Sequence, residues 1–150
     1  MTDFAESTFH DFSSADASLL RAAAVACEGR SDSPLRLLDI GCGTGAILGA
    51  LASAYGVTIC TGIDISQQNA EEARNRLGRL GPGVVANIIA ADYMRTELPL
   101  ADVVISGSTL HLINAPFEAI FGKICRETAL GGRLVFSVPS DCLANSLLCW

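Results

Sequence analysis

The chain has 150 residues, of which 50% are apolar and 17% are charged, a composition that suits one folded domain and excludes intrinsic disorder. Its formal net charge of −6 disfavours binding to the phosphates of nucleic acid. No apolar run reaches the roughly 18 residues that a membrane-spanning helix needs. Segment 1–10 contains no Lys or Arg, which excludes a signal peptide, so we expect a cytoplasmic protein with no membrane or nucleic-acid partner.

Helical and strand-like segments alternate along the chain. Ser13 or Ser14 can cap the first helix, Ser66 can cap the third, and Pro116 suits the first turn of the last. The glycine pair at 131–132 predicts the end of that last helix. In chain order, the expected elements are helix 13–27, strand 35–40, helix 46–55, strand 57–63, helix 67–80, strand 84–90, strand 102–106, helix 116–129 and strand 133–138.

This alternation predicts an α/β fold. Strands joined by helical crossovers form a parallel sheet, and right-handed crossovers make that sheet doubly wound. We therefore expect a Rossmann-like, mostly parallel sheet of about five strands with helices on both faces.

The six cysteines form no CxxC pair, and their spacings fit neither a disulfide framework nor a zinc site. Such usage is typical of small buried apolar side chains in a reducing compartment. We expect no bound metal.

A glycine-rich turn follows the first expected strand. In LLDIGCGTGAI the glycines are Gly41, Gly43 and Gly45. A strand, a glycine turn and a helix together place backbone N–H groups at a helix N-terminus, where anions bind. The motif also fits the dinucleotide fingerprint, because Ala46 stands at its last position.

Asp39 stands two residues before this turn, at the tip of the first strand. A carboxylate there would repel the phosphates of a dinucleotide and attract an ammonium group. A zwitterionic amino-acid group needs both this carboxylate and the anion-binding helix end. The alternative role for Asp39 is a hydrogen bond that braces the turn.

Two further acidic residues end the next strands. Asp64 can accept hydrogen bonds from both hydroxyls of a ribose, of NAD or of another adenosine ligand, or can be a charge near a helix N-terminus. Asp92 can accept from an adenine amine, or can be a solvated loop residue. Tyr93 or Met94 can cover the adenine ring. All these positions lie at the strand ends of one sheet edge, where open α/β sheets bind ligands.

With this glycine turn and these strand-end acidic residues, the sequence resembles the class I S-adenosylmethionine-dependent methyltransferase family, of the small-molecule type. The resemblance runs from about residue 35 to 138, in the blocks LLDIGCGTG, GIDIS, AADYM, ADVVISGSTLHLI and LGGRLVFS. It implies S-adenosyl-L-methionine as cofactor and a cofactor-binding core at 34–138, with an N-terminal cap or helix at 1–33 and a short tail at 139–150. The implied cofactor contacts are Asp39, Gly41, Cys42, Gly43, Gly45, Asp64, Ile65, Asp92, Tyr93 and Ser106.

By the same resemblance, each end of the cofactor has its own residues. Asp39 and the glycine turn would hold the methionine part. Asp64 would take the ribose, Ile65 would pack on the adenine, and Asp92 would bond its amine.

The segment SGSTLHLI after the fourth strand resembles methyltransferases of quinone, biotin-precursor and natural-product pathways. It lacks the motifs of amide, adenine, arginine and ribose methyltransferases. His111 can be a general base on an acceptor hydroxyl, or can hydrogen-bond beneath the substrate loop. Many relatives carry a second His where this chain has Leu112. His10, in an aromatic N-terminal segment, can line the site or belong to a tail that takes no part.

A full domain of this family continues past 138 with a helix and a hairpin of two strands. We therefore expect a fragment, a form completed by a second copy or a partner over the fifth strand and the tail, or a cofactor-binding module without catalysis. An NAD-dependent oxidoreductase is the remaining alternative. Asp39 and Gly45 disfavour it.

Overall fold

The computed structural model of the chain describes residues 12–29, 34–55 and 58–139. No helix in these ranges is long and apolar enough to cross a membrane. In chain order the elements are α1 Ser14–Cys27, β1 Leu35–Ile40, α2 Ala46–Tyr55, β2 Thr58–Asp64, α3 Gln67–Leu77, β3 Val84–Ala90, the 3-10 turn η2 Tyr93–Arg95, β4 Ala101–Gly107, the 3-10 turn η3 Leu110–Leu112, α4 Phe117–Glu127 and β5 Thr128–Ser137.

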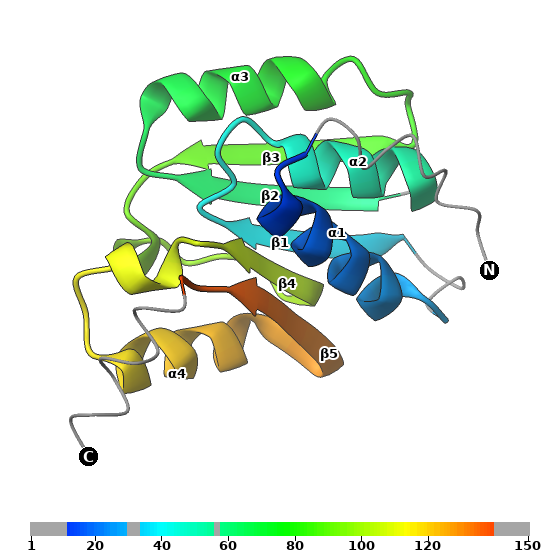
Figure 1. Cartoon of the computed structure of the whole chain (residues 1–150). Coiled ribbons are helices and arrows are strands. Elements are labelled where there is room, and N and C mark those ends of the chain that lie inside the picture. The colour runs from blue at the N-terminus through cyan, green and yellow to red at the C-terminus, as the bar shows by residue number, and fades with distance from the viewer. Residues whose placement is uncertain (1–11, 30–33, 56–57, 140–150) are drawn as a thin grey trace.

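The five strands form one sheet in the order β3-β2-β1-β4-β5, and every neighbouring pair is parallel (Figure 1). The order reverses beside β1, because β2 lies on one side of it and β4 on the other. At such a switch point the connections that leave the two strands diverge and open a crevice at their carboxyl ends. The predicted α/β, doubly wound architecture is confirmed.

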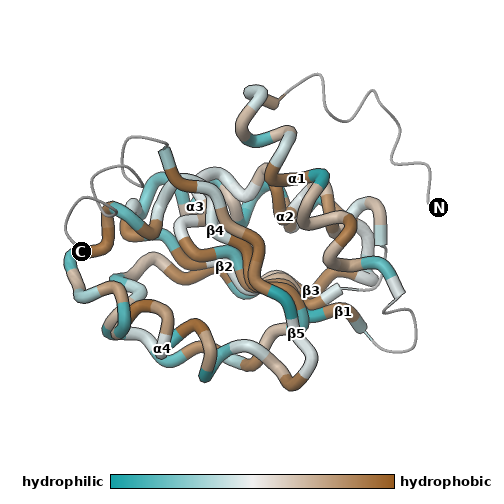
Figure 2. The backbone as a smooth tube through the Cα atoms, turned by 60° about the horizontal axis from the view of Figure 1, so that its bottom comes forward, coloured by the Kyte–Doolittle hydropathy of each residue, from teal (hydrophilic) through white to brown (hydrophobic). Residues whose placement is uncertain are grey.

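Helices cover both faces of the sheet. Helices α1, α2 and α3 lie on one face, and α4 lies on the other (Figure 2). Alternate residues of β1 serve the two layers: Leu37 packs in the core beneath the three helices, whereas Leu38 and Ile40 pack in the core with α4. By the same alternation Asp39 belongs to the face of α1 and α2.

The predicted caps are present at the helix starts. The Ser13 side chain accepts a 3.2 Å hydrogen bond from the N–H of Asp16, and the Ser66 side chain accepts one of 3.3 Å from Asn69. Pro116 is the N-cap of α4 and precedes its first turn. Helix α3 was expected to reach residue 80 but ends at Leu77, because Gly78 is already its C-cap.

The glycine pair Gly131–Gly132 does not end α4, contrary to the sequence prediction. The helix ends at Glu127, and both glycines lie inside β5. They belong to an irregular stretch between the pairs Ala101–Thr128 and Val103–Arg133, in which β5 holds more residues than β4. Gly131 has φ 72°, and a Cβ on Gly132 would lie 2.7 Å from the carbonyl oxygen of Ala129. Glycine is needed here for a bulge.

Candidate functional site

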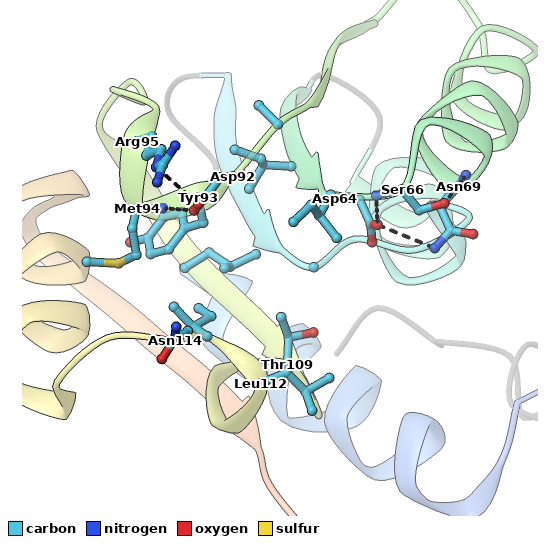
Figure 3. Close-up of a pocket in the computed structure, with 16 residues that line it drawn as sticks. Asp64, Ser66, Asn69, Asp92, Tyr93, Met94, Arg95, Thr109, Leu112 and Asn114 are labelled. Atoms are coloured by element: carbon cyan, nitrogen blue, oxygen red, sulfur yellow. Dashed lines mark hydrogen bonds and ion pairs between the residues drawn. The ribbon is translucent and has the colours of Figure 1, made fainter.

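Two cavities open at the carboxyl ends of the strands, and Gly41 lines both. The larger, of about 620 Å³, lies between the ends of β1, β2 and β3 and the segment after β4 (Figure 3). The smaller, of about 180 Å³, lies between the glycine turn, the end of β4 and the start of α1, which contributes Asp16. Asp39 lines the smaller cavity, whereas Asp64 and Asp92 line the larger.

Asp39 is a buried carboxyl group, with 2% of its surface exposed. No described residue donates a hydrogen bond to it, so the alternative role of bracing the turn has no contact to support it. Burial, and to a smaller extent the negative charge of Asp64, raise the pKa of Asp39 to about 7. A buried acceptor without a donor is costly, and a ligand cation at this position would relieve that cost.

The three glycines of the turn are required for three different reasons. A Cβ on Gly41 would lie 2.1 Å from the hydroxyl oxygen of Thr109, so the segment after β4 packs directly on this residue. A Cβ on Gly45 would lie 2.9 Å from Leu77, so this glycine lets α3 pack against the start of α2. Gly43, with φ 52°, has nothing within 4 Å of its Cβ position and lines the smaller cavity. Only Gly43 of the three faces open space.

Asp64 joins the glycine turn to the start of α3. One carboxylate oxygen accepts a 2.8 Å hydrogen bond from the N–H of Gly43. The other accepts from the N–H of Ser66 at 2.8 Å and from the side chain of Asn69 at 3.4 Å, as the dashed lines of Figure 3 show on that side of the cavity. Ile65, the next residue, lines the cavity with 81% of its surface exposed.

The opposite wall of the larger cavity is the turn η2. Asp92 caps this turn, accepting a 2.8 Å hydrogen bond from the N–H of Met94, and it pairs with Arg95 at 3.6 Å. Tyr93 and Met94 also line the cavity. The ring of Tyr93 is buried and its hydroxyl donates to Glu127 at 2.7 Å; burial and Glu127 together raise the pKa of Tyr93. The hydroxyl of Tyr93 is therefore engaged within the protein.

Ser106 and His111 line neither of these two cavities. Ser106 is fully buried in β4, and its hydroxyl donates to the carbonyl of Ile40 at 2.9 Å. The side chain of His111 is exposed on η3. Cys42 lines the smaller cavity, and burial raises the pKa of its thiol to about 12, which keeps it protonated. The predicted site residue His10 lies outside the described residues.

Sequence reasoning missed several supporting residues of the site. Arg74 of α3 donates twice to the carbonyl of Ile88, and Arg76 donates to the carbonyl of Thr44. Arg76 thus buttresses the glycine turn. The Ser66 cap signalled that Asn69 would lie in the first turn of α3, close to Asp64. No local signal marks Thr109, whose partner Gly41 is remote in sequence.

Comparison with known proteins identifies the family. The model of the family described as "Methyltransferase domain" matches residues 37–132. The chain is 33% identical over 109 residues to a malonyl-[acyl-carrier protein] O-methyltransferase of Anoxybacillus flavithermus, covering 72% of this chain and 40% of that protein. It is 34% identical over 106 residues to the O-methyltransferase cnsE of Penicillium expansum, covering 67% and 37%.

A solved structure shows the same architecture. CalS10, a SAM-bound amino pentose methyltransferase from Micromonospora echinaspora, superposes with a TM-score of 0.65 at 27% identity, covering 87% of this chain and 53% of that one. The chain thus spans about two fifths of the curated relatives and about half of this structure. The matched residues include the glycine turn and all three strand-end aspartates, and the chain belongs to the methyltransferase domain family.

Proposed function

We propose that this chain binds S-adenosyl-L-methionine and takes part in methyl transfer to a small-molecule acceptor. The observation that carries this proposal is Asp39, a buried carboxyl group without a hydrogen-bond donor, which lines a cavity beside an anion-binding helix start. A cation and an anion are needed together to satisfy this site. The amino-acid end of the cofactor presents both.

The remaining residues fit the rest of the cofactor. Asp64 accepts three hydrogen bonds within the protein and keeps lone-pair capacity for a ribose hydroxyl. Exposed Ile65 and, on the opposite wall, Met94 offer apolar surface to a flat base. Asp92, beside Met94, can accept from an exocyclic amine. These assignments support S-adenosyl-L-methionine over NAD, because a dinucleotide has no ammonium group for Asp39.

When bound, the cofactor supplies a methyl group on a sulfonium that is already activated. The chain's own contribution is to hold the cofactor and the acceptor, to orient them toward each other and to exclude water. Asp39 and the N–H groups of the turn fix one end and Asp64 fixes the middle. Gly107 lines the smaller cavity, Thr109 lines the larger, and Gly41 lines both, so the segment after β4 reaches the junction where an acceptor would meet the methyl group.

Three predictions remain proposals. His111 would be a general base only for an acceptor that is protonated at the working pH; it is exposed and adjacent to Leu112, which lines the larger cavity. A cytoplasmic location is supported by Cys42 and Cys60, two buried cysteines that form no disulfide. A second copy or a partner over the edge strand β5 is the proposed completion of the sheet.

The direct test is calorimetric titration of the purified chain with S-adenosylhomocysteine, and with NADH in a separate control titration. We expect micromolar binding of the first and none of the second. Asp39→Asn should abolish the binding, because an amide does not neutralise an ammonium group. The matched control is Glu118→Gln, which removes an exposed carboxylate on α4 and should bind as the wild type does. Binding of NADH instead would overturn the proposal.

A further inference from the structure

The described residues contain a buried ion pair whose members line neither of the two cavities. Lys123 is the only lysine of the chain, and it lies on α4 with Glu127 one turn later. Both are buried, at 5% and 3% exposure. The Lys123 ammonium donates to Glu127 and, at 2.7 Å, to the backbone carbonyl of Thr96. Burying such a pair gives little stability, and apolar residues in its place are often neutral or stabilising. Stability alone therefore does not account for it.

Both charged groups are bonded to the turn η2. Glu127 accepts a 2.7 Å hydrogen bond from the hydroxyl of Tyr93, the first residue of that turn. The Lys123 ammonium lies 4.9 Å from the centre of the Tyr93 ring and bonds Thr96, which follows the turn. Thr96 in turn donates through its hydroxyl to the carbonyl of Asp92 at 2.8 Å. The pair therefore holds the turn at both of its ends.

The same turn is the wall of the larger cavity. Asp92, Met94 and Arg95 lie together on one side of that cavity in Figure 3, across from Asp64. The position of Asp92 and Met94 depends on where Tyr93 and Thr96 are fixed, because only two residues separate Tyr93 from Thr96. A displacement of this wall by about an ångström is enough to lengthen a hydrogen bond to a ligand beyond its normal range.

We propose that Lys123 and Glu127 are positioning residues for the adenine end of the cofactor cavity: through Tyr93 and Thr96 they fix the turn that presents Asp92 and Met94. The inference rests on the proposed function, since it assigns an adenine to that wall. Neither residue lines the cavity, and both act through the turn.

The test uses a variant in which the ion pair is replaced by apolar side chains of similar size, Lys123→Met with Glu127→Leu. A second variant, Tyr93→Phe, removes only the hydroxyl that bonds Glu127. Affinities are measured by calorimetry for two probes, S-adenosylhomocysteine and 5′-methylthioadenosine, which share the adenosine but differ in the amino-acid end. Thermal unfolding is recorded for each variant.

We expect the double variant to fold with an unchanged or higher melting temperature and to bind both probes on the order of tenfold more weakly. Tyr93→Phe should weaken the binding of both probes in the same proportion, but less than the double variant does. Asp39→Asn should give a different pattern, because it should weaken the binding only of the probe that carries the amino-acid end. Equal losses for both probes therefore place the defect at the adenine wall.

The matched control is the ion pair between Arg36 and Asp102. Its atoms lie 2.8 Å apart, near the start of β1 and of β4 and therefore at the opposite end of the sheet from the cavity. Arg36→Met should lower the melting temperature and leave both affinities unchanged.

Three outcomes decide the proposal. Unchanged affinities in both network variants, with a wild type that binds, would overturn this inference alone. A wild type that binds neither probe would overturn the proposed function and the inference with it. If the double variant does not fold, Tyr93→Phe decides, because the loss of one hydroxyl leaves the ion pair in place.

Discussion

The carboxylate of Asp64 accepts a 2.8 Å hydrogen bond from the backbone N–H of Gly43 and so joins the end of β2 to the turn that follows β1. The same side chain holds the N–H of Ser66 at the start of α3. One residue thus orders two segments that line the two cavities, while its own carboxylate faces the larger one. Its substitution should affect both the fold of the turn and the binding of a ligand.

Asp64→Ala should lower the free energy of unfolding by about 1–3 kcal/mol, because two backbone N–H groups lose their acceptor. It should also abolish binding of S-adenosylhomocysteine. Denaturant unfolding and calorimetry measure the two effects. Asp64→Asn is the informative companion, since it keeps one acceptor oxygen but not the charge. Binding by Asp64→Ala at wild-type affinity would exclude Asp64 from the ligand site.

The stability of the ligand-free chain should fall as the pH rises from 3.8 towards 7. Over this range the protonation of Asp39 differs between the folded and the unfolded state. In this range the unfolded chain has lost the Asp39 proton, whereas the folded chain keeps it because the buried carboxyl group has its pKa raised from 3.8 to about 7. The folded state binds the extra proton, so the free energy of unfolding decreases with pH by up to about 4 kcal/mol and levels off above 7.

Asp39→Asn removes this dependence. The stability of the variant relative to the wild type should be greater at pH 8 than at pH 5 by about 1–3 kcal/mol. Urea unfolding at the two pH values gives the difference, and Glu118→Gln, which changes an exposed carboxylate, should show no such gain. A parallel pH dependence in Asp39→Asn and the wild type would contradict the assignment.

Binding of S-adenosylhomocysteine should strengthen with pH up to about 7 and then level off. The ligand ammonium requires an ionised Asp39, whose pKa of about 7 keeps it protonated in the free chain at lower pH. Affinity should therefore rise by up to about tenfold per pH unit below 7, with release of close to one proton. Calorimetry in two buffers with different ionisation enthalpies counts the proton. Binding without proton release at pH 6 would show that Asp39 does not contact the ammonium group.

The second and third glycines of the turn should respond differently to alanine. Gly45→Ala brings a Cβ within 2.9 Å of Leu77 and 3.0 Å of Ala73, at φ 73°, and should cost about 2 kcal/mol or more of stability. Gly43→Ala meets no atom within 4 Å and should cost about 1 kcal/mol, from its φ of 52°. Because Gly43 lines the smaller cavity, its variant should nevertheless bind S-adenosylhomocysteine more weakly. Thermal unfolding and calorimetry on the two variants separate packing from ligand contact.

Much of this architecture is predictable from local pattern. The bounds of β1, α2 and β3 agree with the sequence prediction, because each is a continuous apolar or helical run with polar or glycine residues at its ends. Asp39, Asp64 and Asp92 could be placed at one edge of the sheet, since the carboxyl ends of parallel strands coincide.

Other features depend on contacts between residues far apart in the chain. Tyr93 lines the larger cavity, and its hydroxyl is in addition held by Glu127 of α4, a contact that no local pattern indicates. The pair Gly131–Gly132 has the sequence of a helix stop, but it forms a bulge because β5 must follow the register of β4. His111 was predicted to be a general base or to hydrogen-bond beneath the substrate loop, and its exposure on η3 is set by the fold.

The sequence by itself determined the order of the elements and the chemical groups at the strand ends, because hydrophobic period and turn residues act over a few neighbouring positions. Only the tertiary structure decided which of those groups share a cavity and which are engaged by the protein itself. Thr109 packs on Gly41, and Asp64 bonds Gly43, only after β4 and β2 have paired on either side of β1. These contacts are properties of the packed sheet, whose burial leaves Asp39 without a donor.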